Sequence, residues 1–103
     1  MLKNLAITLT VGLLAGCSGY ENQYSQTVQH NFIQSCVRQC TPGAASSAQC
    51  QAYCQCGMDY TMQHYPYSTF AQLNIDIINQ RHTVESEQFL NEILNACESH
   101  LSN

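Results

Sequence analysis

The segment CVRQCTPGAASSAQCQAYCQC, residues 36–56, holds five of the seven cysteines of this 103-residue chain. It contains the spacing C-x3-C twice, at Cys36 and Cys40 and again at Cys50 and Cys54. Side chains four residues apart share one face of a helix. The Thr-Pro-Gly run between the two pairs stops a helix, because proline cannot continue the backbone hydrogen bonding and glycine suits a turn. The segment therefore predicts two antiparallel helices whose facing sides are joined by disulfide bonds.

The same geometry predicts which cysteines pair. An antiparallel hairpin closed by residues 41–49 brings the two inner cysteines together and the two outer ones together. Cys56 lies about 200° around the helix from Cys54, so it faces away from that seam. Cys97, far along the chain, is its natural partner. The predicted bridges are Cys36–Cys54, Cys40–Cys50 and Cys56–Cys97.

Residues 36–54 resemble the twin C-x3-C helical hairpins of plant α-hairpinins and of small mitochondrial intermembrane-space chaperones. The resemblance implies a disulfide-stapled hairpin and no particular activity. A broader pattern, which includes Phe32, Tyr67 and Cys97, is similar to small secreted bacterial domains and implies a single domain. That pattern leaves a second pairing open, namely Cys36 with Cys56 and Cys54 with Cys97.

The N-terminus has the anatomy of a secretory leader. One lysine is followed by an apolar run over residues 5–15 that is too short to span a bilayer. The run ends in Leu-Leu-Ala-Gly-Cys at residues 13–17, which resembles the lipobox of bacterial lipoproteins. The resemblance implies a signal peptide over residues 1–16 and a palmitate-bearing, lipidated Cys17 that anchors the protein to the bilayer. We expect residues 17–26 to form the lipidated N-terminus and a polar tether, and residues 27–103 to form the folded domain.

Position and charge then restrict where this domain acts. Ser18 follows the lipidated cysteine; by resemblance to enterobacterial lipoproteins, the absence of aspartate there implies the outer membrane, facing the periplasm or the cell surface. Disulfides persist in that compartment. Without Lys3 the chain keeps two arginines against seven acids, so its formal charge is 2 − 7 = −5. An acidic domain with no basic cluster is a poor candidate for binding nucleic acid.

The rest of the pattern predicts an all-α fold of four short helices. The first helix ends before Thr41 and the second covers about residues 48–64, ending before Pro66. Ser68 is the expected N-cap of the third helix, although residues 74–78 also fit a short strand. Thr83 is the expected N-cap of the fourth. Apolar residues at steps of three and four mark the buried faces: Tyr24, Val28, Phe32, Ile33, Cys36, Val37 and Cys40; Phe70, Leu73, Ile77 and Ile78; and Phe89, Leu90, Ile93, Leu94, Cys97 and Leu101.

Three tyrosines gather at the end of the second expected helix, at Tyr60, Tyr65 and Tyr67. Tyrosine offers rigid contact area with a polar tip and is enriched at interfaces. These three residues are therefore the predicted protein-binding surface. The alternative is that their rings cover a thin core.

Patterns typical of catalysis or of metal binding are weak in this sequence. The chain contains neither G-x-S-x-G nor H-E-x-x-H, and we predict no enzyme activity and no cofactor. One set of soft side chains resembles a Cu(I) ligand set: Cys54, Cys56, Met58, Met62 and His64. Cysteines in disulfides cannot also bind metal. The sequence thus predicts a lipid-anchored accessory or structural protein-interaction module whose partner is a protein of the envelope or of a secretion assembly; a periplasmic copper or thiol-redox factor is the alternative.

Overall fold

A computed structural model describes residues 19–43 and 45–102 of the chain. Every regular element in these residues is helical, so the predicted all-α class is confirmed. Four α-helices are accompanied by two 3₁₀ turns. The elements are η1 (Glu21–Gln23), α2 (Gln26–Cys40), α3 (Ser47–His64), α4 (Tyr67–Ile78), α5 (Val84–Cys97) and η2 (Glu98–Leu101). The expected signal peptide, residues 1–16, and the expected lipidation site, Cys17, lie outside the described residues.

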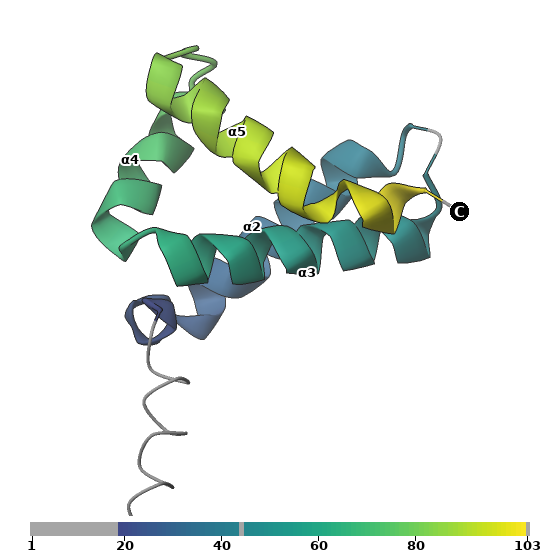
Figure 1. The fold of residues 1–103 in the computed structure, drawn as a ribbon, viewed down its shortest axis with the longest axis horizontal. Helices are drawn as coiled ribbons and strands as arrows, with labels where there is room; N and C mark the ends of the chain where they lie inside the picture. The colour runs from purple at the N-terminus through teal and green to yellow at the C-terminus, as the bar shows by residue number, and fades with distance from the viewer. Residues whose placement is uncertain (1–18, 44, 103) are drawn as a thin grey trace, which may run out of the picture.

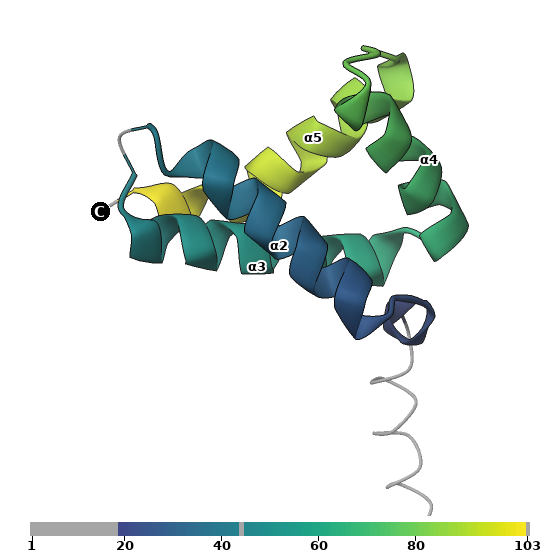
Figure 2. The same ribbon diagram turned by 180° about the vertical axis from the view of Figure 1, so that it is seen from behind.

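The longest helix, α3, organises the arrangement. Helices α2 and α5 both pack along it, whereas α2 has few close backbone approaches to α4 or α5. Figure 1 shows α3, α4 and α5 outlining a triangle, in which α4 is the side that connects α3 to α5. Figure 2, from behind, shows α2 crossing α3 obliquely. The fold is thus a hairpin, α2–α3, with α4 leaving one end of α3 and α5 returning to pack along it.

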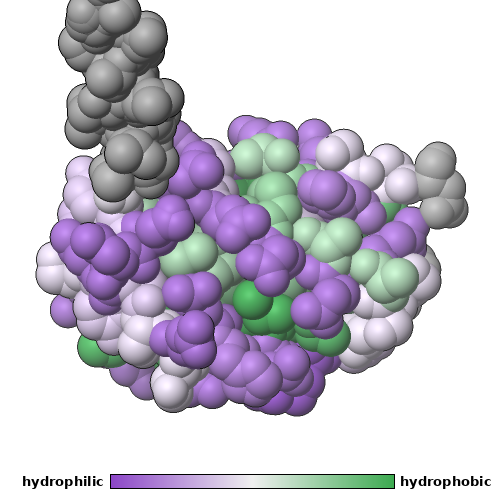
Figure 3. Space-filling model, turned by 90° about the horizontal axis from the view of Figure 1, so that it is seen from below, coloured by the Kyte–Doolittle hydropathy of each residue, from purple (hydrophilic) through white to green (hydrophobic). Residues whose placement is uncertain are grey.

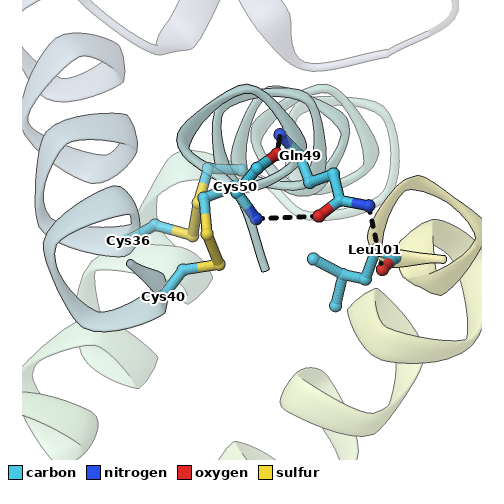
Figure 4. Close-up of a disulfide and its surroundings, with 7 residues drawn as sticks. Cys36, Cys40, Gln49, Cys50 and Leu101 are labelled. Carbon is cyan, nitrogen blue, oxygen red and sulfur yellow. Dashed lines mark hydrogen bonds between the residues drawn. A yellow bond between two sulfur atoms is a disulfide. The ribbon is translucent and has the colours of Figure 1, made fainter. Parts of the chain in front are cut away.

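The three predicted disulfides are confirmed. Figure 4 shows Cys36 and Cys40 reaching from α2 toward α3. Each bridge spans a Cα–Cα distance of 5.7 to 5.8 Å, which is ordinary for a disulfide. The alternative pairing is wrong, because Cys56 points to the opposite side of α3 and reaches α5. The bridges are Cys36–Cys54, Cys40–Cys50 and Cys56–Cys97.

Helix α3 begins one residue earlier than expected, because Ser46 caps it. The Ser46 hydroxyl accepts from the Gln49 N–H at 3.1 Å, and the Gln49 side chain accepts from the Ser46 N–H at 2.8 Å. This reciprocal pair is a capping box. The Gln49 amide also donates to the Leu101 carbonyl at 3.4 Å, which ties η2 to the start of α3 (Figure 4).

The expected cap of α4 is wrong. Pro66 occupies the N-cap position in place of Ser68, and the helix begins at Tyr67. Proline has no side-chain acceptor, and the Tyr67 N–H donates instead to Oε1 of Gln23 in η1 at 3.0 Å. The strand alternative for residues 74–78 is also wrong, since α4 continues to Ile78.

The turn between α4 and α5 is held by its own polar groups. Gln80 adopts a positive φ of 59°, which ends α4 in the left-handed conformation. The Arg81 guanidinium then binds the nearly buried Asp76 carboxylate at 3.0 Å. Thr83 is the N-cap of α5, as predicted, and forms a capping box with Ser86. The turn thus sets the direction of α5 relative to α4.

The core lies between α3, α4 and α5 and includes one residue from the expected tether. Tyr24 is only 3% exposed, and its hydroxyl donates to the Tyr65 carbonyl at 2.7 Å. The Tyr20 N–H donates to the Met62 carbonyl at 2.7 Å. The packed domain therefore begins before residue 27, the expected boundary. The buried apolar residues of the described chain are Tyr24, Cys50, Cys54, Met58, Met62, Phe70, Leu73, Phe89, Ile93 and Cys97.

Some residues expected in the core are exposed. Leu90 and Leu94 are 46% and 41% exposed, and Ile78 is 68% exposed. No residue of α2 is fully buried. The reason is geometric: α5 turns Phe89, Ile93 and Cys97 inward, and no further helix of the described residues covers the remaining width of its apolar stripe.

Candidate functional site

The three predicted binding tyrosines divide into two places. Tyr60 and Tyr65 converge on Glu92 of α5, whereas Tyr67 lies edge-on to the Tyr24 ring with centroids 5.3 Å apart. The Tyr65 ring also meets Phe89 edge-on at 5.1 Å. All three rings are half-buried and pack against the core. They do cover the core, and their contact with a partner stays a prediction.

The carboxylate of Glu92 accepts three hydrogen bonds. Oε1 accepts from Tyr65 at 2.6 Å and from Tyr60 at 3.1 Å, and Oε2 accepts from Gln88 at 3.1 Å. The hydrogen bond from Tyr65 is the main cause that lowers the pKa of Glu92. Burial, followed by the bond to Glu92, raises the pKa of both phenols. A stabilised carboxylate is a weak base and a stabilised phenol a weak acid, so this cluster ties α3 to α5 and is poorly suited to proton transfer.

The soft side chains considered as copper ligands do not converge. Cys54 and Cys56 belong to different bridges, and Met58 and Met62 are buried in the core. His64 is exposed and stacks on the Tyr60 ring, with centroids 4.2 Å apart. Among residues 19–43 and 45–102, no three His, Cys, Asp or Glu side chains are grouped so that they could hold a metal ion.

A large concave feature of about 1420 Å³ is bordered by α2, α4 and α5, and we call it the groove. Its floor consists of core side chains, including Phe32, Phe70 and Phe89. Aliphatic side chains that are largely exposed stand on its rim: Ile75, Ile78 and Leu90. On the face in Figure 3, hydrophobic residues form small separate patches among hydrophilic ones.

Sequence reasoning missed the groove, although a signal was present. The apolar stripe expected on α5 runs through both Phe89 and Leu90, so it is wider than one neighbouring helix can cover. Ile75 and Ile78 widen the apolar face of α4 in the same way. An apolar helix face that is wider than its neighbour can cover predicts exposed apolar surface. Only the packing of the helices shows where that surface lies.

The groove has a charge character opposite to that of the domain. None of the seven acids lines it, whereas Arg38 and His30 do. Arg38 is exposed and makes no ion pair within the described part of the chain, unlike Arg81, which binds Asp76. The groove is therefore a non-acidic face on an acidic protein.

Comparison with protein-family models, with curated proteins and with solved structures found no match for this chain. None of the described helices is long and apolar enough to cross a bilayer. The function is therefore inferred from the groove and the residues that line it.

Proposed function

We propose that this chain is a lipid-anchored protein-interaction module of the bacterial outer membrane and that it binds its partner through the groove. The lipobox-like run at residues 13–17 supports the anchor. Three acyl chains on Cys17 bury enough methylene groups, at about 0.8 kcal/mol each, to make membrane attachment effectively permanent. Because the packed domain starts near Tyr20, the anchor would hold it close to the bilayer surface.

The exposed aliphatic rim of the groove is the observation that carries the binding role. Ile75, Ile78 and Leu90 leave apolar area in water, and covering that area contributes about 25 cal/mol per Å². The groove is larger than most small-molecule pockets, which occupy roughly 300–1,000 Å³. Polar side chains of α2, including Asn31 and Gln34, flank these apolar residues, and an apolar surface flanked by polar groups is the anatomy of a protein interface. These properties favour a protein over a small ligand.

The lining also favours binding over catalysis. It contains no carboxylate, and its cysteines, Cys36 and Cys40, are held in disulfides. The copper or thiol-redox alternative needs free sulfur ligands, and all six cysteines of the described residues are in bridges. We therefore propose no enzymatic activity.

A photocrosslinking experiment in intact cells tests the proposal. The amino acid p-benzoylphenylalanine is placed in the full-length protein at one of three exposed positions: Leu90 on the groove, His64 beside the tyrosine pair, or Gln51 on α3 outside both surfaces. We expect a protein adduct from Leu90 and none from Gln51. An adduct from His64 alone would move the interface to the tyrosines Tyr60 and Tyr65, and no protein adduct from either surface would contradict the interaction role.

The anchor has its own test. Replacing Cys17 with serine should abolish palmitate labelling and release the protein from the membrane fraction, while Ser18→Ala should leave labelling intact. Normal labelling of the Cys17→Ser variant would contradict the anchor without bearing on the groove.

A further inference from the structure

We propose that the occupant of the groove is an amphipathic α-helix of another protein that places a carboxylate beside Arg38. This inference rests on the proposed interaction role and names the class of partner. Four properties of the groove carry it: its size, its apolar floor, its uncommitted amides and its charge.

The size suits a helix. An α-helix with its side chains is about 10–12 Å across, so a volume of 1420 Å³ accommodates roughly three turns. The groove is bordered by three helices, and a fourth would pack into it as helices pack in bundles. Apolar residues at positions i, i+3, i+4 and i+7 of such a helix would face Phe32, Phe70 and Leu90.

The walls of the groove carry polar groups that suit a peptide. Exposed amides on α2 line one side, and none of their side chains is hydrogen-bonded within the described chain: Asn31, Gln34 and Gln39. Side-chain amides both donate and accept hydrogen bonds. The polar flanks of an amphipathic helix can use these groups, whereas hydrocarbon chains of a lipid leave them unused. The amides therefore favour a helix over an acyl chain.

The charge of the groove favours a partner helix that carries a carboxylate. Arg38 lies near the hairpin-loop end of α2, which is the end of the molecule opposite the α4–α5 corner (Figures 1 and 2). Its guanidinium presents donors in a planar fork that matches a carboxylate. With no acid in the lining, nothing inside the groove repels that carboxylate. A second copy of this chain is disfavoured as the occupant, because the chain without its expected leader carries a formal charge of 2 − 7 = −5 and two copies repel each other.

The test extends the Leu90 photocrosslink in the full-length protein by mapping the partner segment by mass spectrometry. We expect a segment with helical apolar spacing and an aspartate or glutamate near one end. Arg38→Gln should lower the adduct yield about threefold to fivefold, in the range for an exposed ion pair, and Arg38→Lys, which keeps the charge but loses the planar fork, should lower it less. Gln51→Glu is the matched control: it also changes the net charge by −1, lies outside the groove, and should leave the yield unchanged.

A charge swap completes the design. Replacing the mapped partner carboxylate with lysine should weaken crosslinking, and Arg38→Glu should restore it. An adduct of two copies of this chain, a lipid adduct, a non-helical segment, or a yield indifferent to Arg38 would each overturn the helix inference. A partner protein with a non-helical segment would leave the proposed function standing, whereas the absence of any protein adduct would overturn both. Circular dichroism of each variant verifies the fold, and Arg38 is exposed and makes no ion pair with the described residues.

Discussion

The hydroxyl of Tyr65 donates a 2.6 Å hydrogen bond to Oε1 of Glu92, twenty-seven residues further along the chain. Tyr65 is the C-cap of α3 and Glu92 lies in the middle of α5, so the bond joins two elements that meet only through folding. The Tyr65 ring packs edge-on against Phe89, one turn before Glu92. Together with the Cys56–Cys97 bridge, these contacts hold α5 against α3.

Removing the hydroxyl should weaken that connection. We expect Tyr65→Phe to lower the free energy of unfolding by about 1 kcal/mol, because the ring stays packed while one hydrogen bond to a carboxylate is lost. Urea unfolding measures the change. Tyr20→Phe is the control, since the Tyr20 hydroxyl makes no hydrogen bond within the described chain. A double-mutant cycle with Glu92→Ala, which removes the acceptor, should show coupling between positions 65 and 92, and simple additivity would contradict a direct bond.

The same cluster predicts how stability depends on pH. Hydrogen bonding from Tyr65 lowers the pKa of Glu92 in the folded state, so its contribution is present above the unfolded value of 4.5 and is lost as the pH falls through the folded value. Burial raises the pKa of Tyr24 and Tyr65 above the unfolded value of 10.0. Their contribution is full below about pH 10 and is lost as the pH rises further.

Thermal unfolding measured from pH 3 to pH 11 should thus show a plateau with a decline at each end. The variants Tyr24→Phe and Tyr65→Phe should decline less steeply on the alkaline side, because a phenylalanine has no proton to lose in the unfolded state. Glu92→Gln should flatten part of the acid decline. An alkaline decline that is identical in all variants would assign it to other groups.

The three disulfides should stabilise the fold unequally. The bridges close segments of 41, 18 and 10 residues for Cys56–Cys97, Cys36–Cys54 and Cys40–Cys50. Taken one at a time, the chain-entropy relation assigns them about 4, 3.2 and 2.7 kcal/mol respectively. Because the two shorter loops are nested, each of these two bridges contributes less while the other is intact, so the paired cysteine-to-alanine variant that lacks Cys56–Cys97 should lose the most stability in urea unfolding. A larger loss from the Cys40–Cys50 pair than from Cys56–Cys97 would contradict an entropic origin.

Gly57 marks a close approach between α3 and α5. A Cβ atom at this position would lie 3.2 Å from Cγ2 of Ile93 and 3.8 Å from the Phe32 ring. Alanine in a helix normally gains about 1 kcal/mol over glycine. Ile93 is buried and stiff at χ1, so overpacking should outweigh that gain. We expect Gly57→Ala to destabilise the protein by about 1 kcal/mol in urea unfolding; a stabilised variant would show that α5 can shift outward.

Much of this fold can be predicted from the sequence because it depends on interactions between residues that are close in the chain. The C-x3-C spacing puts two sulfurs on one helix face, which favours the nested bridges Cys36–Cys54 and Cys40–Cys50, and the fold then excludes the second pairing that the sequence left open. Thr83 caps α5 with groups three residues away. Such signals depend on residues within a turn of each other, so no knowledge of the remaining chain is needed to interpret them.

Other features depend on which elements become neighbours in space. Gln23 supplies the acceptor for the first N–H of α4 from forty-four residues away, so the start of that helix could not be inferred from Ser68 or Pro66. The apolar faces of α4 and α5 are visible in the sequence, but periodicity says only that a face is apolar, and not whether another helix covers it. Helix α2 packs on α3 and leaves Ile78 and Leu90 uncovered, so the groove exists only in the assembled fold.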